Sequence, residues 1–391
     1  MVPGRTLDNA AQKIVIGIPS YNEGRTINYV TRQADLGLKA FFPAADSLII
    51  NTDSDSTDNT KEAFCGTQTS APKKYVNTGK KPRGKGKNLI ALFEYCANLD
   101  VDYVAVLDSD VTTIQPSWVR SLINPLMTRQ CDYTAPVYAR SCYDGNVTNH
   151  FAYPLTRAVF GVELQQPIGG EFGLNKRMYK YLLRQPVTET ELGFGIDIFM
   201  TFHAIGGGLK VCEVSLGKKV HKPGLSTLED KFLQISQSAI AVSRRYRRMG
   251  RSAIRHVEQA KSIRVFKPKR RPDKMLVSRQ MEKFAREIEK NLPAYKRLLG
   301  RELTHRIARV VLLHRQPEVS SVLWIDALSR LLRNCYGKGF NAAVNAKTSR
   351  LLAPLLYWRA VSFWEEIQHL TPEEITEKIQ SQARLLSAKL Q

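Results

Sequence analysis

Asp108 and Asp110 are the residues whose type and spacing point most directly to chemistry. They follow a continuous apolar run at 103–107 that is typical of a buried strand, so their carboxylates must face solvent, a cation or a helix N-terminus. Two acids at this spacing can address a divalent cation and a neighbouring hydroxyl, and hard oxygen ligands suit Mg²⁺ or Mn²⁺. A lone Asp-x-Asp is more often a turn with capping acids, but the place at a strand end favours metal binding.

Two other apolar runs, at 13–19 and 47–51, also end in polar residues. The first leads into Pro-Ser-Tyr-Asn-Glu at 19–23, and the second into the turn Asp-Ser-Asp-Ser-Thr-Asp at 53–58. An open α/β sheet binds its ligands at the carboxyl ends of its strands. We therefore expect the three polar segments to lie together at one edge of a sheet.

A Gly-rich basic loop at 79–86, Gly-Lys-Lys-Pro-Arg-Gly-Lys-Gly, precedes a candidate helix. It fits the pattern G-x-x-x-x-G-K, but Gly86 stands where a phosphate-binding loop needs Ser or Thr to hold Mg²⁺, which disfavours an ATPase or GTPase. The backbone and charge of the loop still suit a diphosphate. The alternative is a solvated basic turn.

The elements that would position these residues alternate between strands and helices. Candidate helices near 25–36, 58–68 and 86–98 lie between and beside the three apolar runs. Continuously apolar strands joined through helices predict a parallel sheet in an α/β fold.

The pattern becomes helical after about residue 225. Residues 226–229 (Ser-Thr-Leu-Glu) have the form of a capping box, and Thr-Pro-Glu-Glu at 371–374 predicts the start of the last helix. We predict a catalytic domain at 1–225 and a helical region at 226–391, with a basic linker at about 244–275.

Composition bounds the class of protein. Of the 391 residues, 58 are Lys or Arg and 36 are Asp or Glu, so the formal net charge of +22 predicts anionic partners. A chain with 43% hydrophobic and 24% charged residues is globular, which excludes a mainly disordered protein. Six cysteines without a C-x-x-C pair predict neither a zinc site nor a redox dithiol. Since no apolar stretch of about 18 residues occurs, we expect a cytoplasmic protein with reduced thiols.

Together the motifs resemble those of nucleotide-sugar glycosyltransferases with the GT-A fold. The Pro-x-Tyr-Asn-Glu segment, the Asp-Ser-x-Ser-Thr-Asp turn and the Asp-Ser-Asp motif occur there in this order. Later segments resemble the retaining enzymes that make mannosylglycerate and glucosylglycerate, and the related glucosyl-3-phosphoglycerate synthases. These segments are 83–86, 145–148, 166–171, 194–197 and 219–222. The similarity covers about residues 12–225 and implies a GT-A domain followed by a helical region.

The resemblance also implies roles for single residues. Asp110 and His221 would hold the divalent metal, and Lys85 would pair with the diphosphate. Asp197 would lie between sugar and acceptor, and with Glu171 and Lys85 it forms the implied catalytic set. The residues implied at the nucleotide and the donor sugar are Pro19, Tyr21, Glu23, Asp53, Lys85, Asp108, Ser109, Gly170 and Glu171.

Two of these residues also fit simpler interpretations. Taken alone, His221 fits a surface histidine in a basic turn, and Asp197 fits an acid at a helix N-terminus. No carboxylate nucleophile of the kind found in retaining glycosidases is evident. Attack on the same face as the departing phosphate, assisted by that phosphate, is therefore the expected route.

The implied acceptor residues are Arg140, Asn146, Val147 and Thr148. Phosphoglycerate-using relatives have Arg in Gly-Arg-Val-Thr, a residue suited to gripping phosphate with two hydrogen bonds, whereas this chain has the neutral Asn146. Arg140 and Thr148 resemble the carboxylate-binding pair of mannosylglycerate synthase, although Arg140 alone also fits a strand-end surface cation. We predict D-glycerate or a similar small hydroxy acid as acceptor. GDP-mannose, GDP-glucose and UDP-glucose stay open as donors.

Two other functions compete with this one. A GT-A enzyme could act at an anionic membrane on a lipid or polysaccharide, which the basic stretch 244–271 favours and the lack of an apolar segment disfavours. A nucleic-acid-binding protein could use the +22 charge, but no base-reading module is recognisable, so we expect no nucleic-acid partner. The basic stretch also fits a solvated helix face. Any homo-oligomer is expected to form through the C-terminal helices.

Overall fold

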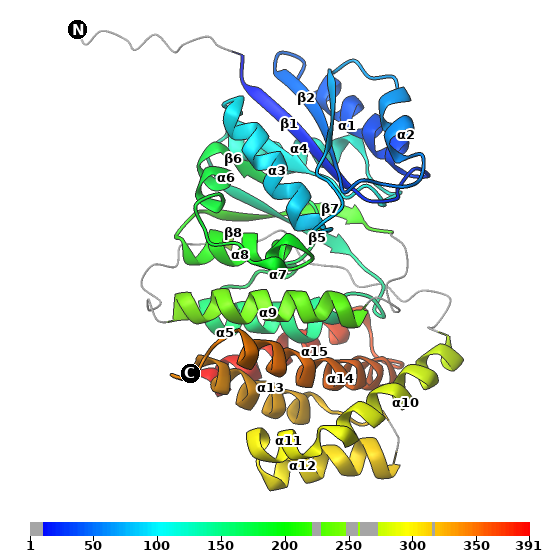
Figure 1. Cartoon of the computed structure of the whole chain (residues 1–391), viewed down its shortest axis with the longest axis vertical. Helices are drawn as coiled ribbons and strands as arrows, with labels where there is room; N and C mark the ends of the chain where they lie inside the picture. Colours follow the sequence, from blue (N-terminus) through cyan, green and yellow to red (C-terminus); the bar gives the residue numbers. More distant parts are fainter. Residues whose placement is uncertain (1–10, 221–227, 248–256, 259–272, 315–316) are drawn as a thin grey trace, which may run out of the picture.

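The computed structural model describes residues 11–220, 228–247, 257–258, 273–314 and 317–391 (Figure 1). The strands are β1 (Lys13–Ser20), β2 (Asp46–Asp53), β3 (Lys73–Asn77), β4 (Tyr103–Val106), β5 (Tyr133–Ala139), β6 (Phe172–Asn175), β7 (Val211–Lys218) and β8 (Val257–Glu258). The α-helices of the first half are α1 (Ile27–Phe41), α2 (Thr60–Gly66), α3 (Lys85–Asn98), α4 (Pro116–Met127), α5 (Tyr153–Phe160), α6 (Lys176–Leu182), α7 (Glu189–Leu192) and α8 (Ile196–Gly206). Those of the second half are α9 (Leu228–Arg247), α10 (Lys274–Lys290), α11 (Leu292–Leu299), α12 (Arg301–Ala308), α13 (Ser321–Tyr336), α14 (Ala342–Glu366) and α15 (Pro372–Leu390). Two π-helices, η1 (Thr148–Ala152) and η4 (Arg309–His314), complete the described elements.

The described strands form one sheet in the order β3-β2-β1-β4-β6-β5-β7-β8. β1 pairs in parallel with β2 and β4, which confirms the three predicted strands and the helices between them. β6, which the sequence did not predict, is antiparallel to both β4 and β5, so the parallel arrangement holds for the three predicted strands and the whole sheet is mixed. The reason is that the chain stays at the carboxyl edge of the sheet after β5 and enters β6 from that edge.

The strand β1 is buried on both faces. Ile14 and Ile16 pack in the cluster that contains α1 and α4, whereas Val15 packs in the cluster that contains α3. Successive side chains of a strand point to opposite faces, so a strand covered by helices on both sides is apolar throughout. Gly17 lets α3 approach closely, because a Cβ there would lie 2.1 Å from Leu92 Cδ2.

The C-terminal helices pack against the sheet domain through a shared core. Figure 1 shows the sheet in the upper half of the molecule and these helices in the lower half, with α5 and α9 between them. One hydrophobic cluster runs from the sheet through α5, α8 and α9 into α13, α14 and α15. The mainly helical character after residue 225 is confirmed, and the division into two domains there stays a prediction.

Two predicted helix starts can be compared with the structure. α9 begins at Leu228, while Ser226 and Thr227 of the predicted capping box lie outside the described residues. At α15 the capping box is present: Glu374 N donates to Thr371 Oγ1 at 3.2 Å, and Thr371 N donates to Glu374 Oε2 at 2.7 Å.

The first residues of the predicted basic linker belong to α9, which continues through Arg247. Arg244 donates to the carbonyl of Gly337 at 3.3 Å, and Arg247 donates to the carbonyl of Leu390 at 2.5 Å. These arginines therefore tie α9 to the C-terminal helices. Most of the remaining linker, 248–256 and 259–272, lies outside the described residues and stays a prediction.

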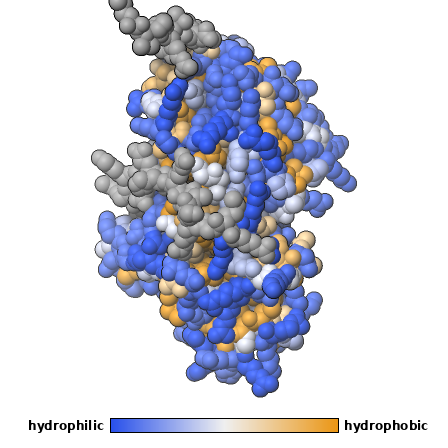
Figure 2. Space-filling model, turned by 90° about the vertical axis from the view of Figure 1, so that its left-hand side faces the viewer, coloured by the Kyte–Doolittle hydropathy of each residue, from blue (hydrophilic) through white to orange (hydrophobic). Residues whose placement is uncertain are grey.

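The surface carries both hydrophilic and apolar residues. Figure 2 shows one side of the molecule, on which hydrophilic residues dominate and apolar residues form smaller patches. None of the helices in the described part of the chain has the length and the hydrophobicity that crossing a membrane requires. None of the six cysteines, all of which lie in the described part of the chain, forms a disulfide.

Candidate functional site

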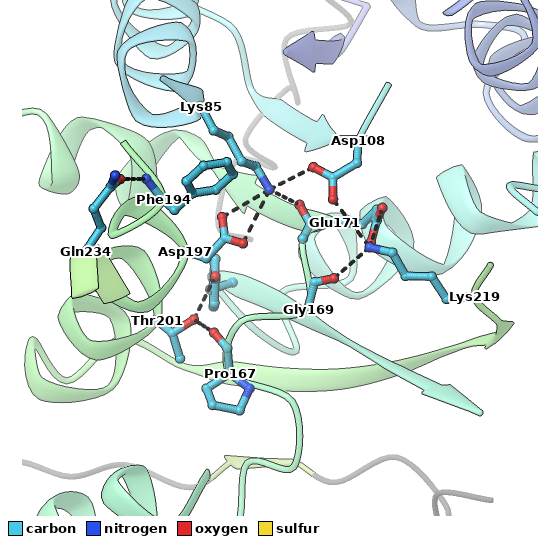
Figure 3. A network of polar contacts seen from close by, with 12 residues as sticks. Lys85, Asp108, Pro167, Gly169, Glu171, Phe194, Asp197, Thr201, Lys219 and Gln234 are labelled. Atoms are coloured by element: carbon cyan, nitrogen blue, oxygen red, sulfur yellow. Dashed lines mark hydrogen bonds and ion pairs between the residues drawn. The ribbon is translucent and has the colours of Figure 1, made fainter. Parts of the chain in front are cut away.

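Five charged side chains converge where the central strands end (Figure 3). Lys85 Nζ lies 2.7 Å from Asp108 Oδ1 and 3.1 Å from Asp197 Oδ1. Lys219 Nζ lies 2.7 Å from Glu171 Oε2 and 3.3 Å from Asp108 Oδ2. Asp108 therefore bridges the two ammonium groups. We call these five residues the charge cluster.

Each member of the charge cluster comes from a different element. Lys85 is the first residue of α3, and Asp197 lies in the first turn of α8. Asp108 follows β4, Lys219 follows β7, and Glu171 directly precedes β6. Because β6 runs antiparallel to β4, its first residue lies at the same edge as the end of β4.

Burial and charge act against each other in the cluster. Burial would lower the pKa of Lys85, but Asp108 and Asp197 outweigh it and raise that pKa. Burial would raise the pKa of Asp108, but the two lysines hold it well below its usual range. For Glu171 and Asp197 burial prevails, and the pKa of each is raised. Three carboxylates face two ammonium groups, so the fully ionised cluster carries an excess negative charge that favours a cation nearby.

Gly170 makes the close packing of the cluster possible. Its φ is +105°, and a Cβ there would lie 2.3 Å from Asp108 Oδ2 and 2.8 Å from Lys219 Nζ. Its carbonyl accepts a hydrogen bond from Lys85 Nζ at 3.0 Å. A side chain at this position would push the bridging carboxylate of Asp108 away from a lysine.

The glycines of the basic loop allow α3 to lie close to α7. A Cβ on Gly84 would lie 2.4 Å from the Leu192 carbonyl oxygen, and one on Gly86 would lie 1.7 Å from that of Glu191. Gly86 N also donates to the Gly193 carbonyl at 3.1 Å. This contact fixes the start of α3, and with it the direction of the Lys85 side chain.

A second polar network holds the ends of β1 and β2. Asp53 is fully buried, and its carboxylate accepts hydrogen bonds from Ser20 Oγ at 2.6 Å, Ser56 N at 2.7 Å and Tyr75 Oη at 2.9 Å. Its oxygens are thus occupied by protein donors, and Asp53 shapes the turn at 53–58. The direct contact to a nucleotide implied by the resemblance stays a prediction.

The other predicted nucleotide residues lie beside this network. Ser109 donates from its hydroxyl to the Pro19 carbonyl at 2.8 Å, which joins the ends of β4 and β1. Arg83 lies over the ring of Tyr21, 4.0 Å from its centroid. Glu23 is half-buried and accepts a hydrogen bond from the Thr26 hydroxyl at 3.2 Å. The structure therefore gathers the residues that the sequence predicted at this edge.

The metal prediction rests on Asp110 and His221. Asp110 is half-buried and lies two residues beyond Asp108, while His221 lies outside the described residues. Among the described residues no three His, Cys, Asp or Glu side chains are grouped as a metal site. An acid beside a cluster with excess negative charge is a suitable oxygen ligand for a hard cation. The ligand pair itself stays a prediction.

Two of the four predicted acceptor residues line a cavity, and the other two are engaged within the protein. Arg140 and Thr148 both line a small cavity, and Arg140 Nε donates to Gln166 Oε1 at 2.8 Å. Val147 packs in the hydrophobic core. The Asn146 amide donates to the Tyr143 carbonyl at 3.2 Å and accepts from Trp364 Nε1 at 3.2 Å, so it is engaged within the protein.

Sequence reasoning missed Lys219 and Tyr138. Lys219 lies in the segment 219–222 that carries the resemblance but is assigned no role there, although its position directly after a strand is the signal that identified Asp108. Tyr138, in β5, donates from its hydroxyl to Glu171 Oε2. No local pattern distinguishes it from an ordinary core tyrosine.

The match to a known family decides the class of protein. Residues 15–188 match the model described as glycosyl transferase family 2. The protein is a glycosyltransferase. Its sheet, with β6 antiparallel among parallel strands, has the GT-A fold that the sequence predicted.

Proteins similar to this glycosyltransferase include two glucosyl-3-phosphoglycerate synthases. The one from Mycolicibacterium smegmatis is 25% identical over 228 residues, which cover 54% of this chain and 71% of that protein. The one from Petrotoga mobilis is 25% identical over 309 residues, which cover 74% of this chain and 90% of that protein. A solved structure of glucosyl-3-phosphoglycerate synthase from Mycobacterium tuberculosis with phosphoglyceric acid is 24% identical, with a TM-score of 0.49, and the match covers 60% of this chain and 81% of that one.

The charge cluster predicts a specific effect of removing Lys85. The substitution Lys85→Met leaves three buried carboxylates with one ammonium group, so the glycosyltransferase should lose about 3 kcal/mol of unfolding free energy near pH 7.5. The loss should be smaller at pH 5, because Asp197, whose pKa burial already raises, then takes up a proton more readily. Urea unfolding at the two pH values measures both effects.

The matched control is Lys80→Met. Its side chain is 72% exposed and its nitrogen lies 3.6 Å from Asp55 Oδ2, so little or no stability should be lost. Equal effects of the two substitutions at both pH values would contradict the analysis of the cluster.

Proposed function

We propose that this glycosyltransferase moves a hexose from a nucleoside-diphosphate sugar to a small hydroxy acid of the glycerate class, with retention of configuration. The observation that carries the proposal is the convergence of Lys85, Lys219, Asp108, Glu171 and Asp197 at the carboxyl edge of the sheet. Ligands of open α/β sheets bind at this edge. The resemblance to glucosyl-3-phosphoglycerate synthases supports glucose as the hexose and a glycerate-type acceptor.

The leaving group of this reaction is a nucleoside diphosphate, whose negative charge grows as the bond to the sugar breaks. Lys85 supplies a buried ammonium group for that charge, because the site excludes most of the water that would otherwise weaken the interaction. Asp110 and His221 would hold the divalent cation, Mg²⁺ or Mn²⁺. That cation, when bound, neutralises the diphosphate further.

The sugar and the acceptor would meet between Glu171 and Asp197. The acceptor hydroxyl attacks the anomeric carbon on the face from which the diphosphate departs, the bond from that carbon to phosphate oxygen breaks, and the hydroxyl proton passes to the departing phosphate. Asp197 and Glu171 would orient the acceptor and sugar hydroxyls by accepting hydrogen bonds. Neither carboxylate needs to act as a nucleophile, since both are paired with lysines.

The acceptor is proposed to be D-glycerate in preference to 3-phosphoglycerate. Arg140 would bind the carboxylate, and Thr148 would donate to the same group or to a hydroxyl. Asn146 carries no charge for a phosphate, and its amide is already engaged with Trp364 and Tyr143. Losing a charged hydrogen-bond partner forfeits about 1.5–3 kcal/mol, which corresponds to roughly a 10- to 100-fold loss of affinity.

The metal role is tested with Asp110→Ala. We expect this variant to lose turnover and the Mn²⁺-dependent part of nucleoside-diphosphate binding while its thermal unfolding is unchanged, and His221→Ala to behave alike. Asp46→Ala, an exposed acid at the start of β2, is the matched control and should keep both properties. Turnover is followed against Mn²⁺ concentration. Near-wild-type turnover of Asp110→Ala at low metal concentration would exclude Asp110 as a ligand.

The acceptor is tested by assaying D-glycerate and 3-phosphoglycerate side by side. We expect a higher kcat/KM for D-glycerate, and a KM for it that rises about 10-fold or more in Arg140→Ala. Arg177→Ala, whose side chain is 64% exposed, should leave that KM unchanged. A clear preference for 3-phosphoglycerate would overturn the acceptor proposal, and full activity of Arg140→Ala would remove the carboxylate clamp.

A further inference from the structure

Three side chains of the C-terminal helices donate hydrogen bonds to the segment 146–150, which carries three of the implied acceptor residues. Trp364 of α14 donates from Nε1 to Asn146 Oδ1 at 3.2 Å. Gln382 of α15 donates from Nε2 to the Asn149 carbonyl at 3.0 Å, and Trp324 of α13 donates from Nε1 to the His150 carbonyl at 2.9 Å. Each of the three helices thus contributes one donor to five consecutive residues.

The three side chains that donate these hydrogen bonds are buried, which restricts their movement. Trp324, Trp364 and Gln382 are 0%, 6% and 2% exposed. Leaving a buried indole N–H, a buried amide or its acceptor unpaired costs free energy. These hydrogen bonds therefore fix the segment 146–150 in one position relative to the C-terminal helices.

The orientation of the Gln382 amide is set by Arg359. The guanidinium of Arg359 is fully buried and can only donate, and its Nε donates to Gln382 Oε1 at 3.1 Å. The amide nitrogen must therefore point the other way, toward the Asn149 carbonyl.

Glu366 balances the charge of Arg359 through contacts of 2.5 Å and 3.1 Å, and Lys378 lies 2.9 Å from the same carboxylate.

Part of the supported segment has an unusual backbone conformation. Residues 148–152 form the π-helix η1, a wide turn that is rare and often occurs at functional sites. The cavity that Arg140 and Thr148 share has its opposite wall on α15, at Ile375, Thr376 and Ile379. The C-terminal helices therefore both hold the segment and border the space next to it.

We propose that α13, α14 and α15 position the acceptor side of the active site, and that Trp364 and Gln382 are positioning residues for the acceptor. The donor side is built from α3, α8 and the strand ends, so loosening 146–150 should affect the acceptor before the donor. This assignment to the acceptor rests on the proposed function.

The test compares two conservative substitutions on the same helix. Trp364→Phe keeps an aromatic ring against Tyr143, whose ring lies 6.1 Å away, and removes only the donor to Asn146. Trp358→Phe is the matched control, because Trp358 is 1% exposed and its Nε1 has no hydrogen-bond partner in the described part of the chain. Thermal unfolding verifies that both variants are folded.

We expect Trp364→Phe to raise the KM for the acceptor about 3- to 10-fold, the effect of one lost hydrogen bond, with the KM for the nucleotide sugar unchanged. Amide hydrogen exchange of residues 145–150 should become faster in this variant, and Trp358→Phe should change neither quantity. A second variant, Gln382→Met, should raise the acceptor KM in the same selective way.

Two outcomes would overturn the proposal. One is unchanged exchange at 145–150 in Trp364→Phe, and the other is a rise of donor and acceptor KM by the same factor. If the wild-type protein transfers no sugar to any glycerate-type acceptor, the proposed function fails, and the exchange measurement still decides whether α14 holds this segment.

Discussion

The burial of two ammonium groups among three carboxylates at the ends of the central strands is the constraint on which this structure depends. Removing charges from water is costly, and the cost is offset only when each charge has well-placed partners. Asp108 meets this requirement by bridging Lys85 and Lys219, with contacts of 2.7 Å and 3.3 Å. These ion pairs fix the start of α3 and the ends of β4 and β7 relative to one another.

Other features of the fold follow from the same requirement. The strand β6 runs against its neighbours, and this brings Glu171 to the edge where Lys219 needs a second partner. Gly170 has no side chain because one would collide with Asp108 and Lys219. Gly84 and Gly86 let α3 begin against α7, so that Lys85 is directed into the cluster.

The two polar networks at this edge differ in what they can do. Asp53 is fully buried and accepts hydrogen bonds from serine and tyrosine donors, so in this structure it sets the shape of a turn. In the charge cluster Lys85 contacts the carboxylates of Asp108 and Asp197 and the Gly170 carbonyl. A bound diphosphate could replace Asp108 as a partner of Lys85, because Asp108 would keep Lys219 as its partner. This exchange of partners is what would make Lys85 available to a leaving group.

The sequence predicted the strands β1, β2 and β4 and their polar ends, because apolar runs and the residues that follow them are local signals. It also named four of the five members of the charge cluster, whose roles stay predictions. It did not predict the direction of β6 or the role of Lys219, since both depend on residues far apart in the chain. The contact between Trp364 and Asn146 spans 218 residues and has no local signature either. For His221 and most of the stretch 248–272, the sequence-based interpretation stays a prediction.

The most direct test of the account is the affinity of the folded protein for a nucleoside diphosphate in the presence of Mn²⁺. Titration calorimetry with UDP and GDP should detect binding to the wild-type protein, a loss of about 10-fold or more in Lys85→Met, as expected for a charge-assisted contact, and no change in Lys39→Met, which alters an exposed lysine in the last turn of α1. Equal affinities of the wild-type protein and a folded Lys85→Met variant would contradict the claim that the charge cluster receives the diphosphate.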